Sequence, residues 1–317
     1  MELYGKNAVI RPFTAMQRSG RFVHSYIIIG EHGVGKRTSA LYAACMLLCD
    51  NKCACGECVQ CRRVLKNEHP DLRIVERSKK SYSVDDVREV VTDSFTSPND
   101  CDRKIYLFTD CDGWSDAAQA ALLKTTEDPP ESVYYIFTGE RLSSFLGTLI
   151  SRSMVINIES ASKDECTAAL ISMYPEKEEQ ELRDVSASFC GNIGRCREYL
   201  DGNEKLMENV QRIKKLNSAV SAGDEYACSA VLSQITADRT ELSAFLGMFT
   251  ACVRDSIVIK NGRNDLIGCD EQGSRKMSAL PVGRLISIYD NIMDISRACD
   301  LNCNAAAAAA VLSGRLV

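Results

Sequence analysis

The sequence has no long uninterrupted apolar run, no large excess of one charge and no apolar centre in its first residues. No run approaches the roughly 20 residues of a membrane span, and the N-terminal MELYGKNAVIRPF lacks the apolar core of a signal peptide. A net charge of -5 gives no general attraction to nucleic acid or to membranes, so any DNA contact must come from a local patch. We therefore expect a protein of the cytoplasm that has no membrane partner.

Cysteine, in contrast, is abundant, with 16 residues in a chain of 317. In a small secreted protein this number would suggest disulfides, but the thiols of a cytosolic chain stay reduced. Clustered cysteines then indicate a bound metal, and scattered cysteines behave as small buried hydrophobic side chains.

Five cysteines form one cluster in the segment CDNKCACGECVQC: Cys49, Cys53, Cys55, Cys58 and Cys61. The C-x-x-C-x-x-C core from Cys55 to Cys61 brings three thiolates round one ion, and a fourth would complete the tetrahedral shell of Zn²⁺. We prefer Cys49 as the fourth ligand, because Cys53 is so close to Cys55 that reaching the same ion strains the chain. Four thiolates leave no position for water, which predicts a structural zinc in an insertion at about 49–61. Reduced thiols without metal and an iron–sulfur cluster are the alternatives.

Short apolar, β-rich runs alternate with helical segments through the first half of the chain. The runs are SYIIIG, DLRIVE, KIYLFTD and VYYIFTG, and the helical segments include RTSALYAACMLLC and SDAAQAALLKTTE. This alternation is typical of an α/β fold with a parallel sheet covered by helices. After about residue 158 the β-rich runs stop, and amphipathic helices with polar breaks follow.

The chain is long enough for two or three domains, each with its own core. We predict an α/β domain over 1–158, a small helical, lid-like domain over 159–205 and a larger helical domain over 206–317. The alanine run in NCNAAAAAAVLSGRL is predicted to form the final helix, because alanine is the best helix former and the flanking residues are apolar.

The segment YIIIGEHGVGKRTSA has the form of a phosphate-binding loop, G-x-x-x-x-G-K-[ST], with one defect. The residues of the backbone cradle at the helix N-terminus are Gly30, Gly33, Gly35 and Lys36. Arg37 stands where the pattern requires the hydroxyl that holds Mg²⁺. Thr38 comes one residue late, and because one helical residue is a rotation of about 100°, we expect it to point away from the metal. The loop predicts weak or passive nucleotide binding at most; a plain strand-to-helix turn is the alternative.

The strand KIYLFTD provides a second test of the same site. In P-loop ATPases an aspartate at this strand end helps to hold Mg²⁺, and a following glutamate polarises water. Here Thr109 takes the metal position and Asp110 the base position. Asp112 is a nearby carboxylate for which we expect a solvated loop role. Two independent defects in one site favour a degenerate ATPase.

Together these motifs resemble those of the bacterial clamp-loader AAA+ proteins. The similar features run in order through the N-terminal half: RFVHSYIIIGEHGVGKR, the cysteine insertion, NEHPDLRIVE, AALLKTTEDPP and LISRS. The resemblance implies an AAA+ P-loop domain with a zinc insertion, a helical lid and an all-α collar for oligomerisation. Arg37 and Thr109 place the chain with the class that has lost its catalytic site. Gly194 agrees, since it stands where ATP-binding relatives carry a lid arginine, with Arg195 one position later.

The segment ISRSM is similar to the Ser-Arg-Cys motif of this family and appears here as Ser151, Arg152 and Ser153. In the family this arginine reaches into the nucleotide site of the neighbouring subunit. The resemblance therefore implies a subunit that has lost its own site and supplies an arginine finger in trans. A surface salt bridge is the alternative interpretation of Arg152.

The resemblance implies a role in DNA replication, as a non-hydrolysing subunit of the DNA polymerase III complex that loads the sliding clamp at primer-template DNA. The implied partners are the tau/gamma ATPase subunits and the delta subunit, with clamp and DNA contacted through the complex. One alternative is an active tau/gamma-type ATPase. Another is a zinc-dependent DNA-binding module, for which Arg62, Arg63 and Lys66 give local support, although such cations on a helix are usually a solvated face.

Overall fold

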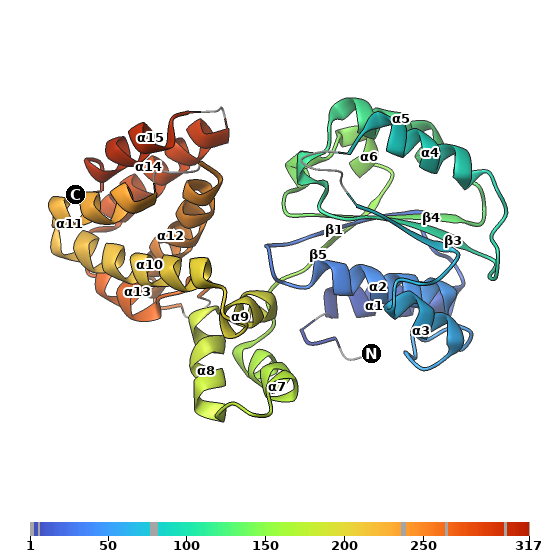
Figure 1. The fold of residues 1–317 in the computed structure, drawn as a ribbon, viewed down its shortest axis with the longest axis horizontal. Coiled ribbons are helices and arrows are strands. Elements are labelled where there is room, and N and C mark those ends of the chain that lie inside the picture. Colours follow the sequence, from blue (N-terminus) through green and yellow to red (C-terminus); the bar gives the residue numbers. More distant parts are fainter. Residues whose placement is uncertain are drawn as a thin grey trace. The chain divides into compact units, whose positions relative to one another are not determined.

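The computed structural model describes residues 3–5, 7–76, 82–235, 239–263, 266–300 and 303–316. The chain divides into two compact units, Met1–Ala161 and Ser162–Val317. The first unit holds the strands, whereas the described residues of the second form helices and turns only (Figure 1). The boundary that the sequence predicts after residue 158 lies close to this division. The further division of the helical part after residue 205 stays a prediction.

Five strands form the sheet: β1 (Ser25–Ile29), β2 (Leu72–Val75), β3 (Lys104–Phe108), β4 (Val133–Gly139) and β5 (Met154–Asn157). Their order is β2-β3-β4-β1-β5, and every neighbouring pair is parallel. A strand covered on both faces is apolar at consecutive positions, because neither face meets water. Tyr26, Ile27 and Ile28 in β1 fit this rule, since all three are 0% exposed. The parallel α/β sheet predicted from the alternation is confirmed.

Helices cover both faces of the sheet (Figure 1). On one face lie α1 (Asn7–Ser19), α2 (Lys36–Leu48) and α3 (Val59–Leu65), and on the other α4 (Val84–Ser94), α5 (Asp116–Glu127) and α6 (Gly147–Ile150). Successive side chains of a strand point to opposite faces of the sheet. Ile28 therefore packs in one core with Phe13 of α1, whereas Ile27 packs in the other with Trp114.

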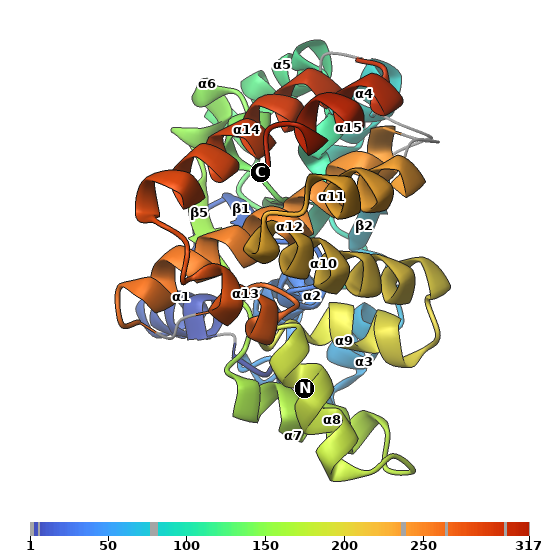
Figure 2. The ribbon, with the colours of Figure 1, turned by 90° about the vertical axis from the view of Figure 1, so that its left-hand side faces the viewer.

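The second unit is built from helices that run from the green to the red end of the colour scale (Figure 2). They are α7 (Lys163–Met173), α8 (Glu179–Ser188), α9 (Ile193–Leu200), α10 (Glu204–Ala222), α11 (Glu225–Leu232), α12 (Arg239–Lys260), α13 (Glu271–Met277), α14 (Val282–Asp300) and α15 (Ala305–Ser313). The first begins with a capping box between Ser162 and Glu165. The predicted helical remainder is confirmed, and α15 covers the alanine run as expected.

One expectation about apolar runs is wrong for α12. Its stretch Glu241–Lys260 is long and apolar enough, by length and composition, to cross a membrane. Half of the stretch is buried inside the protein, and Phe245, Leu246 and Phe249 are 0% exposed. The helix packs against α10, α13 and α14. A helix surrounded by other helices is apolar over most of its circumference, so α12 is the core helix of this unit.

Candidate functional site

The glycine loop between β1 and α2 has the backbone conformation that its sequence requires. Gly33 and Gly35 have φ values of 84° and 90°, in the left-handed region that favours glycine. A Cβ atom on Gly30 would collide with the carbonyl oxygen of Ile158 at the end of β5. The turn and the close approach to the neighbouring strand therefore both depend on glycine.

Lys36 is turned onto the loop that it belongs to. Its Nζ atom donates to the carbonyl oxygens of Gly30 (2.9 Å) and Glu31 (3.0 Å), and Glu140 Oε1 lies 3.9 Å away. Burial lowers the pKa of Lys36, and the nearby Glu140 carboxylate opposes this shift. The ammonium group is thus satisfied by the chain itself.

The residues that follow Lys36 provide no hydroxyl at the metal position. Arg37 points outward, where its Nη1 atom lies 2.9 Å from Glu76 Oε1 in an exposed ion pair. Thr38 is exposed. The loop therefore has the backbone of a phosphate site without a side-chain ligand for Mg²⁺ from either residue.

The end of β3 likewise lacks the acidic pair of a working site. Thr109 is 6% exposed, and its carbonyl oxygen accepts a hydrogen bond from the hydroxyl of Tyr82. Asp110 adopts a left-handed conformation with φ of 54°. Its backbone N–H donates to Thr138 Oγ1 at 3.1 Å. The hydrogen bond to Thr138 joins the ends of β3 and β4. Position 109 itself provides no carboxylate for a metal ion.

Asp112 corrects the expectation of a solvated loop residue. Its carboxylate accepts hydrogen bonds from the backbone N–H groups of Glu140 (2.7 Å) and Arg141 (3.0 Å) and from Ser144 Oγ (3.2 Å). It therefore fixes the segment that follows β4. The partners are 28 or more residues away in sequence, and only the pairing of β3 with β4 brings them together.

Four of the five clustered cysteines converge at the end of α2 and the start of α3. The sulfur atoms of Cys49, Cys55, Cys58 and Cys61 all lie within 4.8 Å of one another. Cys49 Sγ lies 3.7 Å from Cys55 Sγ and 3.9 Å from Cys58 Sγ. A tetrahedral shell with Zn–S bonds of about 2.3 Å has sulfur atoms about 3.8 Å apart. The cluster therefore fits a metal ion of this size and geometry, whereas Cys53 is exposed and outside it.

The backbone around the cluster supports the thiols. The N–H groups of Cys58 and Cys61 donate to the sulfur atoms of Cys55 and Cys58, each at 3.4 Å. The hydrogen bond from Cys58 lowers the pKa of the Cys55 thiol to about 6, whereas burial raises the pKa of Cys61 far above its usual range. Thiolate is the form that binds metal, and the hydrogen bond from Cys58 favours this form of Cys55.

Arg152 follows α6, and its guanidinium group lies on its own unit. The Nη2 atom is 2.5 Å from Glu127 Oε1, and the Nη1 atom is 2.8 Å from the carbonyl oxygen of Thr148 and 3.3 Å from Ser151 Oγ. The side chain of Arg152 is 34% exposed. The ion pair of the alternative interpretation is thus present, at a surface position from which a guanidinium group can meet a ligand.

Two polar contacts that sequence reasoning did not predict hold the segment around Arg152. Gln119 is 1% exposed; its Nε2 atom donates to the carbonyl of Ser144 (2.9 Å), and its Oε1 atom accepts from the N–H of Leu146 (2.8 Å). Ser153 Oγ lies 2.7 Å from Ser25 Oγ at the start of β1. The position of Gln119 among apolar residues of a helix could have indicated a buried polar side chain. It could not have indicated the partners, which are 25 or more residues away in sequence.

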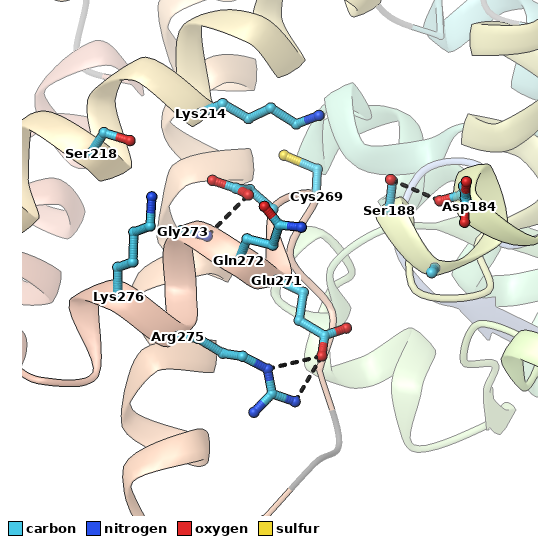
Figure 3. Close-up of a pocket in the computed structure, with 12 residues that line it drawn as sticks. Asp184, Ser188, Lys214, Ser218, Cys269, Glu271, Gln272, Gly273, Arg275 and Lys276 are labelled. Carbon is cyan, nitrogen blue, oxygen red and sulfur yellow. Dashed lines mark hydrogen bonds and ion pairs between the residues drawn. The ribbon is translucent and has the colours of Figure 1, made fainter.

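The helical unit has a cavity of about 550 Å³ lined by α8, α10, α13 and the two residues before α13 (Figure 3). Lys214 and Lys276 contribute ammonium groups to its walls. Glu271 Oε1 accepts two hydrogen bonds from Arg275, at 3.1 and 2.7 Å, and Lys163 Nζ lies 3.3 Å from Glu271 Oε2, so this carboxylate is paired with two cations. The walls come from three segments that are distant in sequence, which is why no motif indicated the cavity. Gly194 and Arg195 lie on α9 of the same unit.

Comparison with known proteins gives matches over the α/β unit and beyond. Residues 5–162 match the family described as DNA polymerase III, delta subunit. A DNA polymerase III subunit delta' from Yersinia pestis is 30% identical over 151 residues, which cover 46% of this chain and 44% of the relative. One from Pseudomonas aeruginosa is 32% identical over 201 residues, 61% of each chain.

A DNA polymerase III subunit gamma from Buchnera aphidicola is 26% identical over 199 residues, which cover 61% of this chain and 55% of the relative. The chain thus spans less than two thirds of the length of each of these three relatives. Both delta' and gamma subunits are among the similar proteins, so the distinction between them depends on the residues of the site.

Proposed function

Because the α/β unit of this chain belongs to the family described as DNA polymerase III, delta subunit, we propose that the protein is a delta-prime-like, non-hydrolysing subunit of the clamp loader. In this role it supports loading of the sliding clamp at primer-template DNA. Its partners are the tau/gamma ATPase subunits and the delta subunit. It carries out no catalysis alone and acts within the DNA-directed DNA polymerase III holoenzyme in the cytoplasm.

The observation that carries this proposal is the state of the phosphate loop. The loop keeps its glycines and Lys36, but Arg37 and Thr109 replace the two side chains that would hold Mg²⁺. Lys36 donates to the carbonyl oxygens of Gly30 and Glu31, which a bound phosphate would have to replace as its partners. These features favour a subunit that keeps the scaffold of a nucleotide site and leaves hydrolysis to its neighbours.

In isolation, the chain should hydrolyse ATP at the background rate, and Lys36→Ala should leave that rate unchanged. The physical reason is that no side chain at positions 37 and 109 coordinates Mg²⁺, which neutralises charge in phosphoryl transfer. The measurement is phosphate release by both purified proteins. Robust hydrolysis that Lys36→Ala abolishes would move the chain to the active tau/gamma class. The pair Arg37→Thr and Thr109→Asp tests whether the scaffold can regain nucleotide binding.

The cysteine cluster is proposed to hold one structural Zn²⁺. Its four thiolates would fill the tetrahedral shell and leave no position for water, so the ion would join α2 to α3 without a role in catalysis. The rival zinc-dependent DNA-binding module would require direct DNA affinity with a steep dependence on salt. Binding of primed DNA by the isolated chain, measured at two salt concentrations, separates these possibilities.

The exposed face of α14 is the proposed contact of the collar with a neighbouring subunit. Val282 and Ile286 are 39% and 47% exposed, and Tyr289 and Met293 continue the same face of the helix, half-buried. Apolar residues at these spacings form one stripe on a helix. An exposed apolar stripe of this kind is typical of a surface that another protein covers.

Ile286→Arg should weaken assembly of the chain with tau/gamma and delta subunits by about tenfold, because the contact loses a buried apolar side chain and gains a desolvated charge. The same substitution at the adjacent exposed position, Ser287→Arg, is the matched control. Co-purification and sedimentation of mixtures at known concentration measure the effect. Wild-type protein that forms no complex with these subunits would remove the proposed function. Equal assembly by Ile286→Arg and Ser287→Arg would refute only the proposal that this face of α14 contacts a neighbouring subunit.

A further inference from the structure

Glu127 supplies the carboxylate that pairs with the Arg152 guanidinium. It ends α5, and its Oε1 atom lies 2.5 Å from Arg152 Nη2. Both side chains are at the surface, with 53% and 34% exposure. Ion pairs at such positions contribute little to folding stability. The contact does, however, fix the orientation of the guanidinium.

The contacts of Arg152 leave part of the guanidinium available. The group has five N–H donors. Nη2 donates to Glu127, and Nη1 faces the carbonyl oxygen of Thr148 and Ser151 Oγ. Among the residues that the structure describes, none accepts a hydrogen bond from Nε–H or from the second N–H of Nη2. The guanidinium is therefore held through Nη1 and Nη2 and keeps two N–H donors, which can bind the oxygen atoms of a phosphate group.

The elements that carry the two side chains are fixed to each other. Gln119 in α5 bonds to Ser144 and Leu146 in the segment that leads into α6. The C-terminal end of α5 carries two carboxylates, Glu127 and Asp128, although the helix dipole disfavours negative charge there. A local rule broken in this way is often explained by function, and here the negative end of the helix receives the Arg152 cation.

We propose that Glu127 is a positioning residue for Arg152, which it holds ready to contact the phosphate oxygens of a nucleotide bound to a neighbouring subunit. This inference rests on the proposed role of Arg152 as an arginine finger. Fixing a free arginine side chain costs conformational entropy. If this cost is added to the activation barrier, the rate falls by a factor of about ten. Because Glu127 already fixes the guanidinium before the subunits assemble, Arg152 would lose less entropy when it binds the phosphate oxygens. The faster rate would come from a more stable transition state.

The test uses the reconstituted complex with tau/gamma and delta subunits, clamp and primed DNA. Glu127→Gln keeps the size of the side chain and removes its charge, and Asp128→Asn makes the same change one residue later as a control. We expect Glu127→Gln to lower the kcat of stimulated ATPase about three- to tenfold, with unchanged KM for ATP and unchanged assembly. Asp128→Asn should behave as the wild type, and Glu127→Asp should restore part of the rate because it restores the charge.

The double variant separates this inference from the proposed function. In the Arg152→Ala background, Glu127→Gln should have no further effect, because the residue that it positions is gone. A loss of rate with Arg152→Ala but none with Glu127→Gln would overturn the positioning role alone. No loss with Arg152→Ala would remove the arginine finger itself. A higher rate with Glu127→Gln would show that the ion pair restrains Arg152 and would also overturn the proposal.

Discussion

Cys58→Ser should release the metal from the protein and loosen residues 49–65 while the rest of the sheet stays folded. Structural zinc sites bind with apparent free energies of about 10–16 kcal/mol near neutral pH, and much of that energy holds the local fold. Lys52 and Ala54 adopt left-handed conformations with φ values of 54° and 49°. Such conformations cost about 1–2 kcal/mol per residue, so this segment should relax when the ion is lost.

Elemental analysis of the purified protein measures the metal directly. The wild type should carry about one Zn²⁺ per chain, and Cys58→Ser should carry almost none. Cys53→Ser is the matched control, since Cys53 is exposed and outside the cluster. Hydrogen exchange should report faster exchange in residues 49–65 of Cys58→Ser only. Full occupancy in Cys58→Ser, or no metal in the wild type, would refute the zinc site, and loss from Cys53→Ser would assign a different fourth ligand.

Arg152→Ala should lower the DNA- and clamp-stimulated ATPase of the reconstituted complex while this protein still folds and assembles. Negative charge is spread over the phosphoryl oxygens in the transition state, and an arginine supplied in trans contributes roughly 10³ to 10⁵ in rate in well-studied GTPases. In a loader with several ATP sites, Arg152→Ala affects only the site that it contacts, so the total ATPase rate should fall by less than this factor. Arg152→Lys should restore only part of the activity, because an ammonium group lacks the planar, two-pronged contact of guanidinium.

The decisive comparison is the stimulated ATPase of complexes assembled at matched stoichiometry with wild-type or Arg152→Ala protein. Loss of the surface ion pair with Glu127 should cost no more than about 1 kcal/mol of stability, so thermal unfolding of the isolated chains should be nearly equal. Indistinguishable ATPase rates would leave Arg152 with its structural contacts only.

The features that could be predicted from sequence are those encoded by neighbouring residues. Gly33 and Gly35 define the loop because their conformations are local. Cys55, Cys58 and Cys61 define the cluster because their spacing is local, and the sheet follows from apolar runs buried on both faces.

The features that sequence reasoning missed are polar contacts between distant segments. Asp112 binds the segment after β4, Gln119 binds the segment before α6, and Glu127 binds Arg152, with sequence separations from 25 to 32 residues. No periodicity or motif records such a contact, because it exists only after the strands have paired. The same limit applies to α12, whose apolar surface is explained only by the helices around it.

The strand order β2-β3-β4-β1-β5 also sets the sequence of events during synthesis. β1 pairs only with β4 and β5, which follow it by more than a hundred residues, so it leaves the ribosome long before either partner. The four clustered cysteines, in contrast, have all emerged once residue 61 has left the ribosome, and no strand contributes a ligand atom to the cluster. Because contacts between distant residues form slowly and domains fold as units during translation, residues 49–61 should become ordered before the sheet if they bind the proposed ion.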